Sequence, residues 1–275
     1  MKEKKRVTGT KRKGTKAGGV KKAKMNAQAQ RIAIKKSKEA AIKAGETTAK
    51  EKPRLSRNMA TRVKTAKGRT TSSTNWLKRQ LNDPYVQKAR IEGRRSRAAF
   101  KLIELNQKHD LVRPGMRIVD LGCAPGGWCE VCTEVMGIDP DDPKVVGIDY
   151  LNMPELPGVI FLEKDFNDDD APDALIEALG GRKVDLVLSD MAAPTTGHRP
   201  TDHIRIIALV ELAASFAAQI LNPGGTFVAK VFQGGTEHQL LGELKKNFES
   251  TFHAKPPASR QDSAETYLIA KGFKG

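Results

Sequence analysis

The chain has 275 residues and a formal net charge of +16 at pH 7, and its basic residues are concentrated at one end. Residues 1–75 contain 24 Lys or Arg and 4 Asp or Glu, whereas residues 76–275 contain 24 and 28. No uninterrupted run of about 18 apolar residues occurs, so by this criterion we exclude a membrane-spanning helix, and no secretory apolar segment follows Met1. The three cysteines are an odd number crowded near one turn, which argues against a disulfide framework and favours a reducing compartment.

Residues 1–75 contain no Phe, Trp or Tyr and few large aliphatic residues. Such a segment cannot bury enough apolar surface to offset the entropy of ordering, so we predict a disordered or transiently helical basic extension. Its charge favours contact with nucleic-acid phosphates, and its Lys-Lys pairs favour RNA. A solubilising extension and a mitochondrial targeting peptide are the alternatives. Residues 76–275 are predicted to form the folded domain.

The first part of that domain is basic and the rest is acidic. Residues 76–117 contain eleven Lys or Arg and four Asp or Glu, whereas residues 118–275 contain 13 and 24. Asp83-Pro84-Tyr85 predicts a turn. Ser96 can cap a helix that carries apolar residues on its inner side. Arg94, Arg95 and Arg97 lie at the start of this helix, where cations oppose the helix dipole, so we predict that they bind phosphate.

Residues 117–128 predict a buried strand, a glycine turn and the start of a helix that runs to about Met136. Glycine lets the backbone approach a ligand, and a helix N-terminus favours an anionic group. The glycine spacing differs from the G-x-G-x-x-G dinucleotide pattern. An ordinary strand-to-helix turn is the alternative. Cys129 and Cys132 are interpreted as small residues on this helix, because no second ligand pair with matching spacing accompanies them, and no metal is expected.

Apolar segments alternate along the remaining chain in a strand-helix rhythm. This pattern predicts an α/β fold with a mostly parallel sheet covered by helices on both faces. The predicted strands are 118–121, 145–149, 159–162, 184–188, 225–232, 251–255 and 266–270, with helices at 202–221 and 237–248. Asp149, Asp165 and Asp190 follow three of the strands at their carboxyl ends, where α/β sheets bind ligands. The carboxylate that ends the second strand can accept hydrogen bonds from two ribose hydroxyls.

Lys230 lies within an apolar strand, so its ammonium group needs either an exit to water or an anionic partner. A salt bridge or a side chain that reaches the surface is the simpler interpretation. The alternative is a catalytic amine whose charge is influenced by Lys101 and which is held in place by Asp190 and Glu265.

Six stretches of sequence match, in order, the pattern of one known family. They are Asp83-Pro84-Tyr85, RSRAAFKL from Arg95, VDLGCAPGGW from Val119, SDMA from Ser189, VFQG from Val231, and Lys255-Pro256 through Ser259-Arg260 to Ser263-Ala264-Glu265. On these stretches, the chain from about Trp76 to Lys274 resembles the FtsJ/RlmE heat-shock ribose 2′-O-methyltransferases. Cys123 stands where the family often has alanine, and residues 235–237 differ from the family pattern.

The resemblance implies a Rossmann-like methyltransferase fold with a seven-stranded sheet and S-adenosylmethionine as the methyl donor. It places the catalytic set on Lys101, Asp190, Lys230 and Glu265. It places the donor contacts on Gly126, Trp128, Asp149, Asp165 and Asp190. The implied reaction is 2′-O-methylation of a ribose, a uridine in 23S ribosomal RNA, during late ribosome assembly.

The expected partner is therefore ribosomal RNA within the large subunit or its precursor, and we expect a cytoplasmic monomer without a membrane partner. A mitochondrial location is the alternative. A ribose methyltransferase acting on transfer RNA or a messenger cap, and a non-catalytic ribosome-assembly factor that binds RNA, are the alternative functions.

Overall fold

The computed structural model describes residues 68, 70–139, 141–233 and 238–275, so most of the predicted extension lies outside the described residues. Within this part of the chain, seven strands form one sheet in the order β3-β2-β1-β4-β5-β7-β6. The strands are β1 (Ile118–Leu121), β2 (Val145–Asp149), β3 (Val159–Glu163), β4 (Val184–Ser189), β5 (Leu221–Phe232), β6 (Phe248–Ala254) and β7 (Glu265–Phe273). Only β7 runs against its neighbours, β5 and β6. The predicted mostly parallel seven-stranded sheet is thus confirmed.

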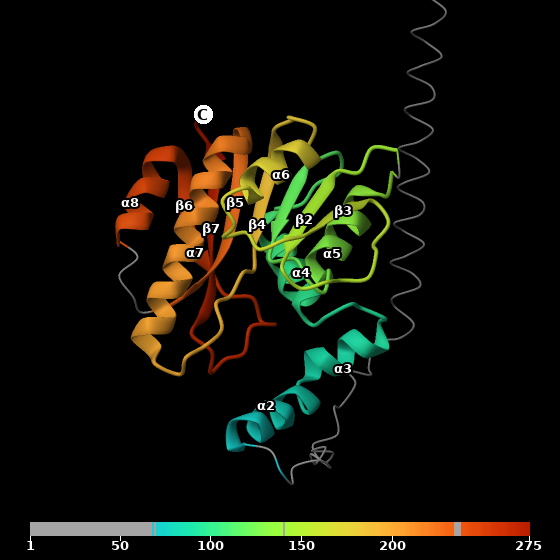
Figure 1. Ribbon diagram of the computed structural model, residues 1–275, viewed down its shortest axis with the longest axis vertical. Coiled ribbons are helices and arrows are strands. Elements are labelled where there is room, and N and C mark those ends of the chain that lie inside the picture. The colour runs from blue at the N-terminus through green and yellow to red at the C-terminus, as the bar shows by residue number, and fades with distance from the viewer. Residues whose placement is uncertain (1–67, 69, 140, 234–237) are drawn as a thin grey trace, which may run out of the picture. The chain divides into compact units, whose positions relative to one another are not determined.

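Helices cover both faces of the sheet (Figure 1). The described helices are α2 (Thr71–Leu81), α3 (Pro84–Ile91), α4 (Ala98–His109), α5 (Gly127–Met136), α6 (Ala171–Ala178), α7 (Arg199–Ile220) and α8 (His238–Asn247). Strand residues alternate between two cores, because successive side chains of a strand point to opposite faces. Val187 packs in the core with α6, α7 and α8, whereas Leu186 and Leu188 pack in the core with α4 and α5.

The helix α7 is the one described helix that is long and apolar enough, by length and composition, to cross a membrane. The sequence criterion missed it because Arg205 and Glu211 interrupt the apolar run. Ile206, Val210 and Phe216 are each about 2% exposed and belong to the core on the sheet. Packing against the sheet therefore accounts for one face of α7, whereas Ile204 and Leu212 are 65% and 39% exposed.

The sheet has a reversal of strand order at its centre, where β1 lies between β2 and β4. The chain passes from β1 outward to β2 and β3, then returns to the other side of β1 as β4. Connections that diverge in this way leave a crevice at the carboxyl ends of the two central strands, and ligands of α/β sheets bind there. The fold therefore predicts a ligand site at the segments that follow β1, β2 and β4.

Three local predictions need correction. Asp83-Pro84-Tyr85 is not an isolated turn: Asp83 is the N-cap of α3, its side chain accepts a hydrogen bond from the backbone N–H of Tyr85, and Pro84 is in the first turn. A proline there loses no helical hydrogen bond. The helix α2 begins at Thr71, inside the segment predicted to be a disordered or transiently helical extension, so the folded part starts earlier than residue 76. The short helix α6 was not predicted.

Candidate active site

Four charged side chains from four different elements meet at the carboxyl edge of the sheet. They are Lys101 on α4, Asp190 after β4, Lys230 on β5 and Glu265 at the start of β7, and we call them the four-residue cluster. Lys101 Nζ lies 2.8 Å from Glu265 Oε2 and 3.9 Å from Asp190 Oδ2. Lys230 Nζ lies 3.2 Å from Asp190 Oδ1 and also donates to the Asp190 backbone carbonyl. The structure therefore brings together all four residues predicted to be catalytic.

Two buried hydroxyl groups fix the carboxylates of the cluster. The Tyr267 hydroxyl donates to Asp190 Oδ1 at 2.9 Å, and the Ser259 hydroxyl donates to Glu265 Oε1 at 2.7 Å. Tyr267 is paired with Lys230 across β5 and β7, which places its ring beside the lysine. Sequence reasoning missed both residues as parts of the site. The available signals were that Ser259 is in a matched stretch and that Tyr267 lies two residues after Glu265.

The electrostatics of the cluster favour an ionised Asp190. Burial by itself would raise the pKa of this carboxyl group. The ammonium groups of Lys230 and Lys101 and the hydrogen bond from Tyr267 outweigh this effect, so the pKa of Asp190 is lowered from its ordinary value. Burial and the nearby carboxylates raise the pKa of the Tyr267 phenol well above its ordinary range, so this hydroxyl remains a donor. The cluster is thus a compact set of two cations and two anions.

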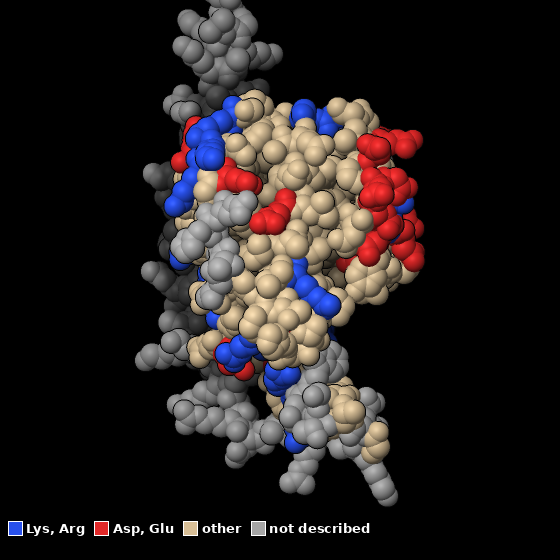
Figure 2. Space-filling view, turned by 60° about the vertical axis from the view of Figure 1, so that its left-hand side comes forward, with Lys and Arg blue, Asp and Glu red and all other residues tan. Residues whose placement is uncertain are grey.

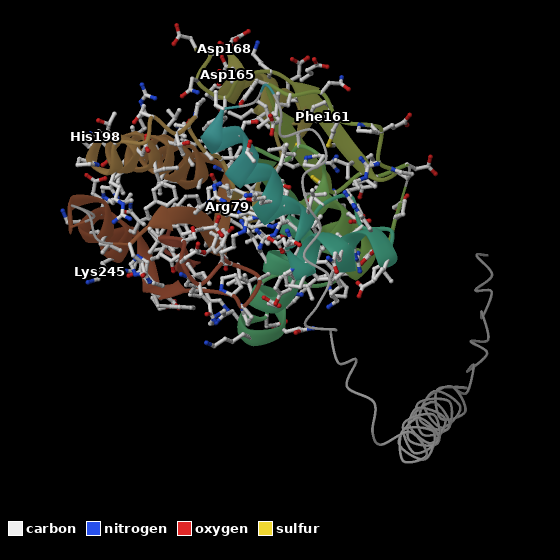
Figure 3. The ribbon with its side chains drawn as sticks, turned by 90° about the horizontal axis from the view of Figure 1, so that it is seen from below. Arg79, Phe161, Asp165, Asp168, His198 and Lys245 are labelled. Carbon is white, nitrogen blue, oxygen red and sulfur yellow. The ribbon has the colours of Figure 1, made fainter. Side chains whose placement is uncertain are left out.

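A cavity of about 930 Å³ opens beside the cluster, and we call it the acidic cavity. Its lining includes Asp149, Asp165 and Asp190, the three carboxylates predicted to lie at strand ends, and it reaches α7. Figure 3 views this edge of the sheet and labels Asp165 near its upper margin. Asp165 Oδ1 accepts two hydrogen bonds from Asn167, whereas its Oδ2 has no partner among the described residues. A free carboxylate oxygen at a cavity can accept a hydrogen bond from a ligand amine or hydroxyl.

Asp149 connects the acidic cavity to the glycine turn. Its Oδ2 accepts from the backbone N–H of Ala124 at 2.9 Å, and its Oδ1 accepts from Leu151 N–H at 2.8 Å. Each oxygen keeps a second lone pair, so the side chain can still accept the two ribose hydroxyls predicted for it. The same carboxylate orders the turn and faces the cavity.

Close approach explains the glycines of the turn. Gly122 has a φ of +76°, and a Cβ there would lie 2.9 Å from the Met191 Cα. Gly126 is the N-cap of α5 with a φ of +96°, a conformation that side chains other than glycine rarely adopt. The Ala124–Pro125 peptide bond is cis. Gly127 and Trp128, at the start of α5, line a small cavity that also borders Asp190, and the first N–H groups of a helix favour an anionic ligand group.

Trp128 can contribute its backbone, since its indole is committed elsewhere. The indole is 2% exposed, donates to the Ala98 carbonyl at 2.9 Å and packs against Tyr267 with ring centroids 5.5 Å apart. The backbone N–H of Trp128 lies in the first turn of α5, where helical N–H groups lack intrahelical partners. Its predicted donor contact is compatible with this backbone group.

Asp120 on β1 is a buried acid that sequence reasoning did not single out. It is 0% exposed, and its Oδ2 accepts a hydrogen bond from Cys129 Sγ at 3.2 Å. Its Oδ1 has no partner among the described residues, and it borders a small cavity under the glycine turn. Burial raises the pKa of Asp120 to about 7. The unpartnered Oδ1 is the group that could accept a hydrogen bond from a ligand amine in this cavity.

The three cysteines are free and buried. Cys129 and Cys132 lie on α5, as predicted. Within the described residues, no group of three or more His, Cys, Asp or Glu side chains could hold a metal ion.

The structure gives each of the three arginines predicted to bind phosphate a partner within the protein. Arg94 forms ion pairs with Glu130 and Glu134 of α5. Arg95 donates to the backbone carbonyls of 154 and 155. Arg97 pairs with Asp83 at 3.0 Å and donates to the carbonyl of 258. Phosphate binding by these three residues stays a prediction, and it would have to compete with these contacts.

The fold and site define the class of the protein. A sheet with this reversal, a glycine turn after β1 and carboxylates after β2 and β3 are typical of α/β domains that bind nucleosides. The sequence matches the FtsJ-like methyltransferase family over residues 94–273, and the chain belongs to this family of methyltransferases.

Three similar proteins are described as ribosomal RNA methyltransferases. Ribosomal RNA large subunit methyltransferase E from Paramagnetospirillum magneticum is 61% identical over 234 residues, which are 84% of this chain and 96% of that protein. The protein of the same name from Brucella ovis is 57% identical over 221 residues, or 80% and 92% of the two chains. A crystal structure of a Plasmodium falciparum protein described as a ribosomal RNA methyltransferase is 34% identical with a TM-score of 0.58, and it covers 66% of this chain and 99% of that one.

Proposed function

We propose that this protein transfers a methyl group from S-adenosylmethionine to the ribose 2′-hydroxyl of a uridine in 23S ribosomal RNA, late in the assembly of the large subunit. One observation carries the proposal: Asp190 lines the acidic cavity and also binds Lys230 of the four-residue cluster. A donor in the cavity and a hydroxyl at the cluster would meet at this residue. Proximity of this kind supplies much of the rate of a transfer reaction.

The acidic cavity has suitable groups for the donor. When bound, S-adenosylmethionine supplies a methyl group already activated by its sulfonium. Asp149 would accept the ribose hydroxyls, and Asp165 would use its unpartnered Oδ2 for the base. Gly126 and Trp128 would present the turn and the first N–H groups of α5 to the amino-acid end.

The four-residue cluster would act on the acceptor. Lys230 is the cluster amine on the strand beside Asp190, and it would first release one ammonium proton to solvent. The neutral amine then orients the 2′-hydroxyl and takes up its proton as the methyl group is transferred. Lys101 and Asp190 set the charge around Lys230. Glu265 holds Lys101 through the 2.8 Å ion pair and is itself held by Ser259. All residues assigned to proton transfer belong to the cluster or, like Ser259, bind one of its members.

The proposed partner is ribosomal RNA in the large subunit or its precursor, bound by a cytoplasmic monomer. The names of the bacterial relatives support a ribosomal substrate. A single-stranded or loop nucleotide suits the site, because its ribose must be exposed to reach the carboxyl edge of the sheet. Residues 1–75 are proposed to be an RNA-contacting extension of this domain.

Labelled S-adenosylmethionine tests the proposal directly. Purified protein is incubated with large-subunit particles, with total ribosomal RNA and with transfer RNA, and the labelled nucleoside is identified by mass spectrometry. We expect label on the ribose of one uridine of the large-subunit RNA. Label on a base, or on transfer RNA alone, would contradict the proposal, and donor binding without transfer to any RNA would favour an assembly factor.

A further inference from the structure

The helices α2 and α3, residues Thr71–Ile91, precede residues 94–273, which match the family model, and we call these two helices the arm. The arm lies below the carboxyl ends of the parallel strands in Figure 1 and crosses in front of that edge in Figure 3, where Arg79 is labelled near the centre of the view. The cluster and the acidic cavity open at the same edge. The position of the arm is therefore suited to contact a substrate that occupies the site.

The body of the domain holds α3 firmly. Asp83, at the N-cap of α3, is 6% exposed and pairs with Arg97 at 3.0 Å and Arg260 at 2.9 Å. The Tyr85 hydroxyl donates to Glu104 Oε1 at 2.8 Å. Buried ion pairs and hydrogen bonds of this kind fix orientation even where they add little net stability. The arm is thus joined to the loop before β7 that also carries Ser259.

The charge of the arm is of one sign. Neither α2 nor α3 contains Asp or Glu, and together they contain four cations, of which Lys88 pairs with Glu92 and lies over the Phe100 ring. The other three, Lys78, Arg79 and Arg90, are exposed. Within the described ranges none of these three has an acidic partner. Asp83, the one acid between the helices, is neutralised by two arginines.

The three exposed cations of the arm differ from Arg94, Arg95 and Arg97, whose side chains bind other groups of the protein. Acidic side chains also gather along one margin of the molecule in Figure 2, whereas several Lys and Arg side chains are visible toward its lower end. Ile91, next to Arg90, is 85% exposed. Exposed cations beside an exposed apolar side chain suit a partner with phosphates, sugars and bases, which is RNA.

We propose that the arm binds the phosphate backbone of the RNA next to the target nucleotide, through Lys78, Arg79 and Arg90. This inference rests on the proposed function, because it assigns a surface to the same substrate. Cations in the last turn of a helix also stabilise the helix, because they interact favourably with the helix dipole. That effect alone would change stability and leave RNA affinity unchanged, so the two roles are separable.

The first experiment removes the three charges in the full chain. The variant Lys78→Gln, Arg79→Gln, Arg90→Gln is compared with the control Lys108→Gln, Lys245→Gln, Lys246→Gln, which removes equal charge from exposed positions on α4 and α8. RNA affinity is measured at several salt concentrations. We expect the arm variant to bind about 10- to 100-fold more weakly at low salt, and its slope of log affinity against log salt to be about 2–3 smaller in magnitude.

The control variant is expected to stay within about 3-fold of the wild type in affinity, since its charges lie away from the site. Both variants should keep the donor affinity of the wild type. Equal loss of affinity in the two variants would overturn the inference. If the wild type does not methylate RNA at all, the proposed function fails; if it does and the arm variant binds like the control, only the arm inference fails.

The second experiment locates the contact. The native cysteines are buried, so a thiol placed at the surface by Arg79→Cys can carry a reagent that cleaves nearby RNA backbone. Lys245→Cys on α8 is the control position. We expect cleavage within a few nucleotides of the methylated position for the arm probe alone. Cleavage only at remote positions, or a loss of affinity for intact particles with normal affinity for the bare RNA, would contradict RNA binding and indicate a protein partner instead.

Discussion

The four-residue cluster and the acidic cavity share Asp190 but differ in how far their polar groups are already satisfied. In the cluster, the side chains of Lys101 and Lys230 are 10% and 8% exposed, and both have carboxylate partners. In the cavity, an oxygen of Asp165 is free among the described residues, and the rim residue Tyr150 is 57% exposed. The cluster is organised before any ligand arrives, whereas the cavity keeps hydrogen-bonding capacity for one. The two regions should therefore respond differently to mutation.

The largest expected effect is on the cluster. Lys230→Ala should lower the single-turnover rate of methyl transfer by about 10²–10⁴-fold, the usual contribution of general acid–base catalysis. Donor affinity should remain nearly that of the wild type, because the lysine is assigned to the hydroxyl. Rapid-quench kinetics and calorimetry measure the two quantities. Lys245→Ala on α8 is the control, and near-normal turnover of Lys230→Ala would show that the lysine has another role.

The second prediction concerns the acid beneath the glycine turn. Because the pKa of Asp120 is raised to about 7 in the folded protein, folding favours its neutral form, and stability is lost as the pH rises from about 4 through 7. Between pH 5.5 and pH 8.5 the wild type should lose about 2 kcal/mol more free energy of unfolding than Asp120→Asn. Urea titrations at the two pH values test this. Parallel pH dependence in both proteins would rule out a raised pKa.

The third prediction concerns the acidic cavity. Asp149→Ala should weaken donor binding by about 1–3 kcal/mol, the scale of losing hydrogen bonds to a charged group. Asp149→Asn is the matched variant, since it retains one acceptor for the N–H groups of Ala124 and Leu151. Calorimetry should place it between the wild type and Asp149→Ala. Unchanged donor affinity in both variants would locate the nucleoside elsewhere.

A smaller effect is expected from the support of the cluster. Ser259→Ala removes the 2.7 Å hydrogen bond to Glu265 and leaves that oxygen without its donor. The activation free energy of transfer should rise by about 1 kcal/mol, which lowers the transfer rate roughly 5-fold. The donor affinity should stay unchanged. A purely structural role would instead lower stability and leave the rate per folded molecule unchanged, which denaturant unfolding and active-site titration can distinguish.

The basic extension should have the smallest effect on the chemical step. Because α2 begins at Thr71 with its cap at Thr70, the truncation that leaves the domain intact removes residues 1–67. It should weaken RNA binding and lower the salt dependence of that binding, with little change in the saturated rate. Binding titrations at two salt concentrations test this. Equal salt slopes for the two proteins would discard the phosphate-contact hypothesis and leave the organellar targeting peptide as the alternative.

Local sequence patterns predicted the centre of the fold and the carboxylates of the cavity. A short apolar strand that ends in an acid leaves little freedom for where Asp149 or Asp190 can lie in a parallel sheet. The catalytic set came from the resemblance, because its members lie up to 164 residues apart, as in the contact between Lys101 and Glu265. The sequence does not show which distant partner a charged side chain will meet.

Two features illustrate that limit. Arg97 was predicted to bind phosphate, but its contacts are with Asp83 and with a carbonyl 161 residues away in sequence. Asp83-Pro84 was interpreted as a turn, although Asp at an N-cap followed by Pro in the first turn is also a helix start. The available signal there was the run of good helix formers that follows. Distant partners set the contacts of Arg97, whereas local capping explains the start of α3.

A double-mutant cycle with Lys230→Ala and Asp149→Ala tests the division between cluster and cavity most directly. For the wild type, both single variants and the double variant, the single-turnover rate constant is divided by the dissociation constant of the donor. If the cluster acts on the hydroxyl and the cavity holds the donor, the two free-energy changes should add within about 0.5 kcal/mol, as they do for independent sites. A coupling of more than about 1 kcal/mol would mean that the two residues act on the same group, which would contradict the account.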